Sequence, residues 1–229
     1  MRIRNLMGVA LVLLGAAWTC CANSEPTLTD CGEVAVSAAA GLAETYVEGL
    51  IRTMVVLAAT APVKSASWDG MFALLETFQS ASLPMATWFV LPDGSYHTVS
   101  GGKSSANLSD RAYFPVVMSG GIATGYVVVS RSTGRVSMVT AVPVLSDGSV
   151  IGALGCSLFL DGLSTAIAEN LSLPEAVSFY AATEDGVIAL HSDPSLLQED
   201  VADSGLLVEE TATVVSGLLG WTFGVGPAD

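Results

Sequence analysis

Hydrophobic residues between positions 33 and 61 recur at steps of three and four, which is the period of an amphipathic helix. They form one stripe made of Val36, Ala40, Ala43, Val47, Leu50, Met54 and Leu57. Pro62 is expected to end this helix, because proline lacks the N–H that a helix interior needs. A shorter stripe predicts a second helix over residues 69–80. The folded part therefore begins with a long helical segment, residues 28–64.

After Pro84 the pattern changes to short apolar runs separated by turns. Asp-Gly, which supplies the positive φ angles of a tight hairpin, follows three of these runs. The three runs are residues 88–91, 142–145 and 179–182. Further strands are expected at residues 126–130 and 136–141, and short helices at residues 110–119 and 161–169. Consecutive hairpins with helices outside them indicate an antiparallel sheet and an α+β fold.

Pro174 marks the best internal boundary, because it follows a short polar stretch at the end of a predicted helix. Residues 65–170 have room for a five-stranded sheet and form the expected ligand-binding lobe. Residues 171–229 have room for few strands and little core. We expect them to pack against the larger lobe as a smaller second α/β lobe.

The N-terminal segment has the layout of a secretory signal. Two arginines precede an apolar run over residues 7–18, and small or polar residues follow it. The run is shorter than the about 20 apolar residues of a membrane span. We therefore expect residues 1–22 to be a signal peptide. An uncleaved membrane anchor, or a lipid on Cys20 or Cys21, is the alternative. Either way the protein is expected to be exported: extracellular, periplasmic or on the cell surface.

Composition narrows the range of partners. The 229-residue chain holds 8 Lys and Arg against 22 Asp and Glu, a formal net charge of -14. Nucleic-acid binding needs clustered cations, so we expect none here. Removal of residues 1–22 would leave two cysteines, Cys31 and Cys156, which we expect to be unpaired structural thiols. No metal site and no cofactor are expected.

Known enzyme signatures are missing from the sequence: the Gly-x-Ser-x-Gly elbow, His-Glu-x-x-His, the Walker loop and the dinucleotide fingerprint. Ser100 and Lys103 match the Ser-x-x-Lys of penicillin-recognising acylases. That nucleophile opens a buried helix, whereas these residues belong to a Gly/Ser-rich loop. We therefore expect no catalytic residues and do not expect an enzyme.

The segment 107–114 carries the strongest binding signal. A short helix here would place Arg111 three residues before Phe114, on the side that faces the sheet. A buried cation needs a partner, because an unpaired buried charge is very costly. In one interpretation Arg111 pairs with an internal carboxylate or with strand carbonyls and fixes the helix. In the other its guanidinium faces a cavity and binds a ligand carboxylate through two parallel hydrogen bonds.

Several motifs follow one another between residues 30 and 198. They are the long helix, 88–94, Asp110-Arg111-Ala112-Tyr113-Phe114, Ser132-Thr133-Gly134, 141–144, 147–152, 160–164 and 185–191. Their order resembles that of the extracytoplasmic Cache sensor domains of prokaryotic chemoreceptors and histidine kinases. The resemblance implies a PAS-like antiparallel sheet, with a small-molecule pocket between one face and the loop that carries Arg111.

By position, the resemblance also implies the residues of that pocket. Arg111, Tyr113 and Phe114 would clasp a ligand carboxylate, while Trp88 and Tyr126 would form aromatic walls. An arginine supplies paired donors, a tyrosine a hydroxyl, and aromatic faces exclude water.

Two positions depart from the amino-acid-binding members of that family. Those members have acidic residues, which hold the ligand ammonium group, where this chain aligns Arg131 and Ser157. Without them a bound ammonium would lack its counter-charges in a low-dielectric pocket. We therefore expect a small carboxylate in preference to an amino acid, with a second anionic group near Arg131. An exposed turn position for Arg131 is the alternative.

Relatives with such domains usually continue into a membrane helix and a signalling domain, whereas residues 220–223 resemble the closing strand of the domain here. We therefore expect a sensor-type binding protein without its own output domain. It would act in signal perception or present its solute to a separate membrane receptor. A cell-surface structural or interaction module without a ligand is the alternative. A homodimer through the long helix also remains open.

Overall fold

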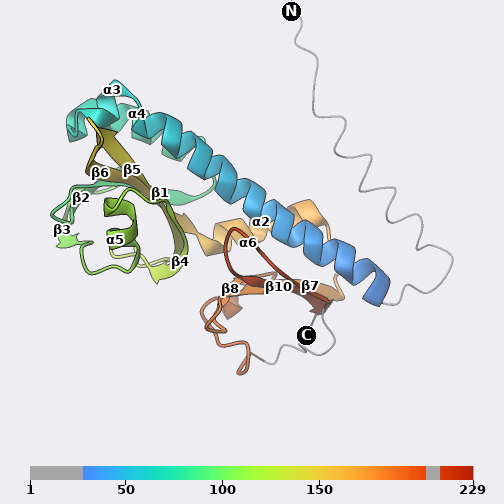
Figure 1. Cartoon of the computed structure of the whole chain (residues 1–229). Helices are drawn as coiled ribbons and strands as arrows, with labels where there is room; N and C mark the ends of the chain where they lie inside the picture. The colour runs from blue at the N-terminus through green and yellow to red at the C-terminus, as the bar shows by residue number, and fades with distance from the viewer. Residues whose placement is uncertain (1–27, 205–211, 229) are drawn as a thin grey trace, which may run out of the picture.

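The computed structural model describes residues 28–204 and 212–228, so the expected signal segment lies outside the described residues. Helix α2 (Leu28–Ala58) has 31 residues, a length of about 46 Å, and packs on both sheets of the molecule (Figure 1). It ends at Ala58. The expectation that Pro62 ends it was wrong, because Pro62 lies in the first turn of α3 (Ala61–Lys64). A missing N–H costs nothing in a first turn.

Six antiparallel strands form the larger sheet, in the order β3-β2-β1-β6-β5-β4. They are β1 (Met85–Val90), β2 (Ser95–Thr98), β3 (Gly102–Asn107), β4 (Ala123–Val129), β5 (Val136–Ser146) and β6 (Ser149–Phe159). Helix α4 (Trp68–Ser80) contacts β1, and Met71, Leu75 and Phe78 are its buried residues.

Two expectations about this sheet were wrong. It has six strands rather than five, because the Gly/Ser-rich segment expected to be a loop forms the edge strand β3. The runs 136–141 and 142–145 are one strand, β5, that continues through Pro143. Strand β4 pairs with β5 only as far as Ala141. At Pro143 one side of β5 therefore has no partner strand among the described residues, and a missing N–H donor is tolerated there.

The larger sheet has two different faces. The face toward α2 and α4 carries large apolar side chains such as Phe89, Leu154 and Leu158. The opposite face carries a separate apolar cluster that includes Trp88, beneath the short helix α5 (Tyr113–Met118). The prediction started α5 at residue 110, but it begins at Tyr113, so Pro115 lies in its first turn and causes no break.

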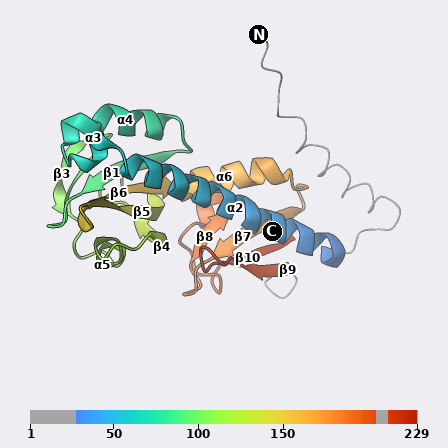
Figure 2. The same cartoon turned by 45° about the horizontal axis from the view of Figure 1, so that its top comes forward.

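The smaller sheet has the order β8-β7-β10-β9. It follows α6 (Leu160–Leu171) and consists of β7 (Val177–Ala182), β8 (Ile188–His191), β9 (Ala212–Val215) and β10 (Thr222–Pro227), with a 3₁₀ helix η1 (Pro194–Leu196) after β8. Helix α6 contacts α2 and strands of both sheets (Figure 2). The α+β expectation is confirmed: a long helix is followed by antiparallel sheets with helices packed against them.

Glu44 and Trp221 connect the smaller sheet to the long helix and to the larger sheet by hydrogen bonds. Glu44 of α2 accepts hydrogen bonds from the Ser216 hydroxyl at 2.6 Å and from the Leu218 backbone N–H at 3.4 Å. Trp221 donates its indole N–H to the carbonyl of Gly125 in β4, at 3.3 Å. The turn between β9 and β10 is thereby attached both to the long helix and to the edge of the larger sheet.

Candidate ligand-binding site

A small cavity lies on the face of the larger sheet that is opposite α2. Its lining comes from β1, β2, β4, β6, the first residue of α5 and the loops that precede α5 and follow β4: Trp88, Tyr96, Leu108, Arg111, Tyr113, Val128, Ser130, Arg131, Ser132 and Ser157. The cavity volume is about 10 Å³, enough for roughly one water molecule. The protein's own side chains therefore fill most of this space.

Trp88 is the largest of these side chains, and a glycine makes its position feasible. Gly155 lies opposite Trp88 in the adjacent strand β6. A Cβ atom at Gly155 would lie 2.2 Å from two carbons of the indole, far inside van der Waals contact. The indole therefore covers the space that a side chain at position 155 would occupy. Its N–H donates to the Ser157 hydroxyl at 3.3 Å.

Three aromatic rings form a continuous wall. The Tyr113 ring lies 6.0 Å from Trp88, and Tyr126 contacts Tyr113 edge-on at 6.0 Å. Burial raises the pKa of the Tyr113 hydroxyl to about 12, so it stays protonated and able to donate at neutral pH. The wall therefore presents a neutral hydroxyl that can donate a hydrogen bond to an acceptor in the cavity.

Arg111 lies in the turn before α5, not on the helix, and its side chain reaches the cavity. One terminal nitrogen donates to the Val129 carbonyl of β4, at 3.2 Å. Within residues 28–204 and 212–228 its buried Nε has no hydrogen-bond partner, and neither has the buried hydroxyl of Tyr96, which also lines the cavity. The strand-carbonyl interpretation thus accounts for one nitrogen of Arg111. Its buried Nε remains available to a group in the cavity, because buried donors are normally satisfied.

Arg131 is occupied by a carboxylate from the chain itself. Its two terminal nitrogens donate to the two oxygens of Asp110 at 2.8 and 2.7 Å, and it also donates to the Asn107 carbonyl. The guanidinium holds the pKa of Asp110 below its usual value of 3.8. A second anionic group of a ligand would therefore have to compete with Asp110 for Arg131.

The structure brings together five of the seven residues named from the sequence. Trp88, Arg111, Tyr113, Arg131 and Ser157 line the cavity. The other two do not, because Phe114 is buried in the apolar cluster of α5 and Tyr126 reaches the site only through Tyr113.

Sequence reasoning missed Tyr96 and Asp110. Tyr96 lies opposite Val90 in β2, two residues after the Asp-Gly turn. Side-chain alternation from Trp88 through this hairpin would have placed it on the same face. Asp110 is 21 residues from Arg131, and no local signal joins the two.

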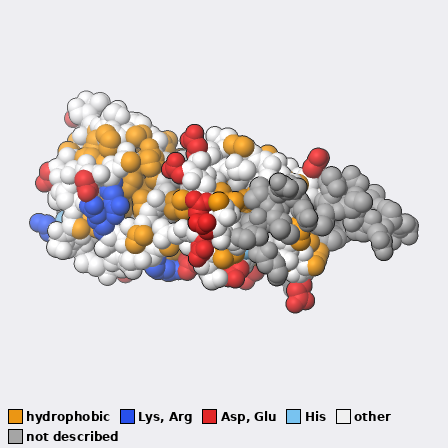
Figure 3. Space-filling model, turned by 90° about the horizontal axis from the view of Figure 1, so that it is seen from below, with side chains coloured by type: hydrophobic (Ala, Val, Ile, Leu, Met, Phe, Trp, Pro, Cys, Tyr) orange, Lys and Arg blue, Asp and Glu red, His pale blue; other side chains and the backbone are white. Residues whose placement is uncertain are grey.

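As far as the structure describes the chain, the charges of the cavity lining are all positive: two arginines line it, and neither Asp nor Glu does. Every Lys and Arg after residue 22 lies between Arg52 and Arg135, whereas 22 acids are spread along the chain. In the view of Figure 3 the basic side chains accordingly gather toward the end of the molecule that carries the larger sheet. Among the described residues no cluster of His, Cys, Asp and Glu could hold a metal ion.

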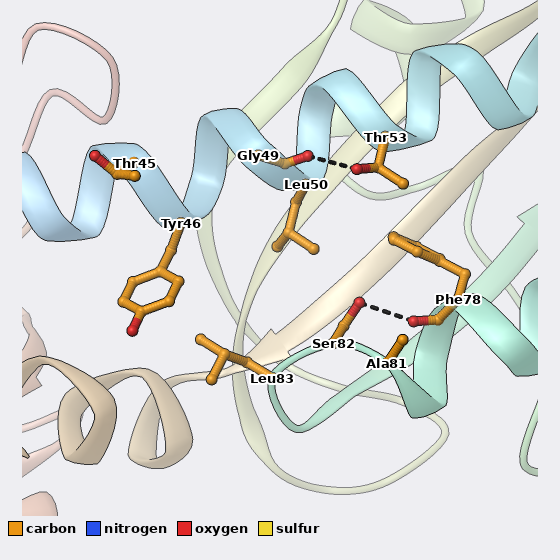
Figure 4. Close-up of a pocket in the computed structure, with 9 residues that line it drawn as sticks. All are labelled: Thr45, Tyr46, Gly49, Leu50, Thr53, Phe78, Ala81, Ser82 and Leu83. Carbon is orange, nitrogen blue, oxygen red and sulfur yellow. Dashed lines mark hydrogen bonds between the residues drawn. The ribbon is translucent and has the colours of Figure 1, made fainter. Parts of the chain in front are cut away.

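A larger groove, of about 660 Å³, runs between α2 and the end of α4 (Figure 4). Its hydroxyls are used within the chain: Thr53 donates to the Gly49 carbonyl at 2.8 Å and Ser82 to the Phe78 carbonyl at 2.8 Å. None of the described residues that line it is charged. It offers methyl groups and rings but few polar contacts, so the Arg111 cavity remains the better candidate.

No protein-family model matches the chain, and no curated protein is similar enough in sequence to be matched. Solved structures do match. The ligand-binding domain of the Pseudomonas fluorescens chemoreceptor CtaA, in complex with L-serine, has a TM-score of 0.64 at 15% identity, over 87% of this chain and 95% of that one. The ligand-binding domain of the Pseudomonas aeruginosa amino acid chemoreceptor PctB, in complex with L-Arg, has a TM-score of 0.64 at 20% identity, and the match covers 87% of this chain and 92% of that one. The ligand-binding domain of the Campylobacter jejuni chemoreceptor Tlp3, in complex with 4-methylisoleucine, has a TM-score of 0.66 at 11% identity, and the match covers 92% of this chain and 95% of that one.

These neighbours are ligand-binding domains of receptors and not enzymes, in agreement with the expectation for this chain. The ligands named with them are amino acids, which runs against the expectation that a carboxylate is preferred to an amino acid. The similarity extends over most of each chain and includes the long helix and the antiparallel sheets. The chain has the fold of the Cache-type ligand-binding domains of bacterial chemoreceptors.

Proposed function

We propose that this protein is an exported sensor-type binding protein whose ligand is a small carboxylic acid held by Arg111. The observation that carries the proposal is the Nε of Arg111, a charged donor that is buried, belongs to a side chain lining the cavity and has no partner among the described residues. A carboxylate oxygen accepts charge-assisted hydrogen bonds that are about twice as strong as neutral ones. Tyr113 and Tyr96 supply hydroxyls beside it.

The lining favours a carboxylate without an ammonium group. An ammonium needs acidic or carbonyl acceptors, and the cavity lining has no Asp or Glu. Asp110 is the nearby acid, but Arg131 occupies both of its oxygens. The same pair argues against the second anionic group first expected near Arg131. The amino acids bound by the neighbouring structures are the counter-argument, so amino acids belong in the test.

A structural module without a ligand is the second candidate, and the small volume of the cavity favours it. At about 10 Å³ the cavity admits a ligand only if the loop before α5 moves. In the binding proposal this movement accompanies ligand entry and signals it. In the structural alternative the aromatic wall is simply packing.

Thermal unfolding with matched pairs of acids separates these alternatives. Lactate and alanine differ mainly in a hydroxyl for an ammonium, so lactate is expected to raise the melting temperature of the wild type more than alanine does. A ligand at 100 times its Kd stabilises a protein by about 2.7 kcal/mol. Arg111→Met should remove the lactate response. Arg52→Met, at an exposed cation on α2, should keep it.

Two results would contradict the proposal: stabilisation by alanine beyond that by lactate, or a lactate response that persists in Arg111→Met. Export, and presentation of the ligand to a separate membrane receptor, complete the proposal. The N-terminal sequence of the mature protein tests the first of these.

A further inference from the structure

A second hollow adjoins the Arg111 cavity. It has a volume of about 310 Å³ and lies on the same face of the larger sheet. Its lining consists mainly of small hydroxyl and glycine residues with one cation: Ala86, Thr98, Ser100, Gly101, Gly102, Ser104, Ser105, Arg131, Ser132 and Thr133. We call it the hydroxyl groove. Its volume is at the lower end of the range found for small-molecule sites.

The hydroxyl groove is continuous with the cavity. Arg131 and Ser132 line both spaces. The Ser132 hydroxyl lies 3.2 Å from that of Ser130, which lines the cavity. A molecule whose carboxylate is bound at Arg111 therefore has a polar path toward the groove, past the Arg131–Asp110 ion pair.

Several hydroxyls of the groove are arranged as donors. Thr98 accepts the backbone N–H of Gly101 at 3.0 Å, and Ser104 accepts that of Ala106 at 3.1 Å. Thr133 accepts the N–H of Arg135 at 3.3 Å. A hydroxyl that accepts in this way keeps its own hydrogen for donation. Among the described residues none of these three hydroxyls donates to the chain, so the groove presents O–H donors.

The chemistry of the groove limits what it can bind. In the part of the chain that the structure describes, neither Asp nor Glu lines the groove, and Asp110 already neutralises its arginine, so neither a cation nor a second anion is favoured. Few apolar side chains line it, so an alkyl tail would gain little from burial. Hydroxyl groups fit best, because each can accept from the groove and donate to its oxygens.

We infer that the hydroxyl groove binds the hydroxylated tail of the ligand, so that the ligand class of this protein is polyhydroxy carboxylic acids, such as sugar acids. This inference rests on the proposed function for the carboxylate end. It specifies the chemistry of the ligand tail and the groove residues that select it. It also explains why a carboxylate without hydroxyl groups would bind weakly.

Calorimetric titration of the full chain with three probes tests the inference. Gluconate has both a carboxylate and hydroxyls, hexanoate has the same number of carbons and no hydroxyls, and sorbitol has hydroxyls and no carboxylate. Gluconate is expected to bind more tightly than either. Equal affinity for gluconate and hexanoate, including no binding of either, would overturn the inference.

Two double variants test whether the hydroxyl groove causes the preference for gluconate. In the Ser104→Ala/Thr133→Val variant each lost hydrogen bond should weaken gluconate binding about fivefold, because one such bond is worth about 1 kcal/mol. Hexanoate binding should not change. Ser149→Ala/Thr165→Val removes the same atoms at exposed positions outside the groove and should behave as the wild type.

The same titrations distinguish failure of the groove from failure of the carboxylate site. If Arg111→Met weakens gluconate and hexanoate alike while the groove variant binds gluconate normally, the carboxylate proposal stands and the groove inference is overturned. If sorbitol binds as tightly as gluconate and Arg111→Met has no effect, the groove binds hydroxyls and the carboxylate proposal fails.

Discussion

Replacement of Gly155 by alanine tests whether the indole of Trp88 lies over Gly155 of β6, where it forms part of the aromatic wall of the binding site. The added Cβ would lie 2.2, 2.2 and 2.5 Å from three carbons of the indole. Carbon atoms in good contact lie about 3.5–4.0 Å apart, so the ring would have to move by more than about 1 Å. Trp88 is 3% exposed and sits on a central strand, so neither it nor the backbone can yield easily.

The expected cost follows from this geometry. Overpacking of a buried site costs about 1–3 kcal/mol, and a rigid ring between paired strands places Gly155→Ala in the upper part of that range. A loss of about 2–3 kcal/mol lowers the melting temperature of a chain of this size by about 5–10 °C. Urea unfolding followed by circular dichroism measures the free energy. The indole N–H resonance of Trp88 reports the loss of its bond to Ser157.

Gly41→Ala is the matched control. Gly41 lies on the exposed side of α2, and a Cβ there would have no atom within 4 Å. Alanine at this position should stabilise the helix by about 0.5–1 kcal/mol. The same chemical change thus has opposite signs at the two glycines. Equal stability of the two variants, with an unchanged Trp88 indole resonance, would refute the placement of Trp88.

Three further predictions concern other parts of the molecule. Glu44→Ala leaves the donors of Ser216 and Leu218 without their acceptor and should lower the free energy of urea unfolding by about 1–3 kcal/mol. Glu48→Ala, which breaks an exposed ion pair with Arg52, should lower it by no more than about 0.5 kcal/mol. Equal effects of the two substitutions would contradict the role of Glu44 in attaching the turn between β9 and β10 to α2. Arg131 lowers the pKa of Asp110, so the stability that this ion pair contributes is present above the unfolded-state pKa and is lost as the pH falls through the folded-state pKa. NMR of the side-chain carboxyl groups should show a titration midpoint of Asp110 below 3.8 that rises in Arg131→Gln. An unchanged midpoint in that variant would contradict the ion pair. Burial raises the pKa of Cys156 to about 12, so brief alkylation and peptide mapping should label Cys156 only in unfolded protein; rapid labelling of the native protein would show an accessible thiol.

The sequence predicted the elements whose pattern is local. The stripe of α2, the stripe of α4 and the Asp-Gly hairpins each lie within a continuous segment, and each corresponds to a helix or strand pair in the structure. The short motif around Arg111 left two interpretations open, a contact with strand carbonyls and a place beside a cavity, and the side chain both contacts the Val129 carbonyl and lines the cavity. We expected a helix that carries both Arg111 and Phe114 to direct Arg111 toward the sheet. The helix begins only at Tyr113, so the Arg111 side chain reaches the sheet from the preceding turn.

Features that depend on pairing between distant segments were not predictable. β3 consists of glycine, alanine and polar residues with no strand pattern, and it is a strand because β2 offers it an edge. The partner of Arg131 was missed because Asp110 comes from another loop. Gly155 is one of 23 glycines, and only the position of Trp88 across the β1–β6 pair shows why it is a glycine.

The central claim is that the buried Nε of Arg111 is the donor that a ligand carboxylate satisfies. The most direct measurement is the ¹⁵N resonance of that Nε–H, assigned by its loss in Arg111→Lys, during titration with lactate and with gluconate. We expect a saturable shift of this resonance at the same concentrations that raise the melting temperature. An Arg111 Nε–H that does not move while either acid stabilises the protein would place the binding site elsewhere and contradict the claim.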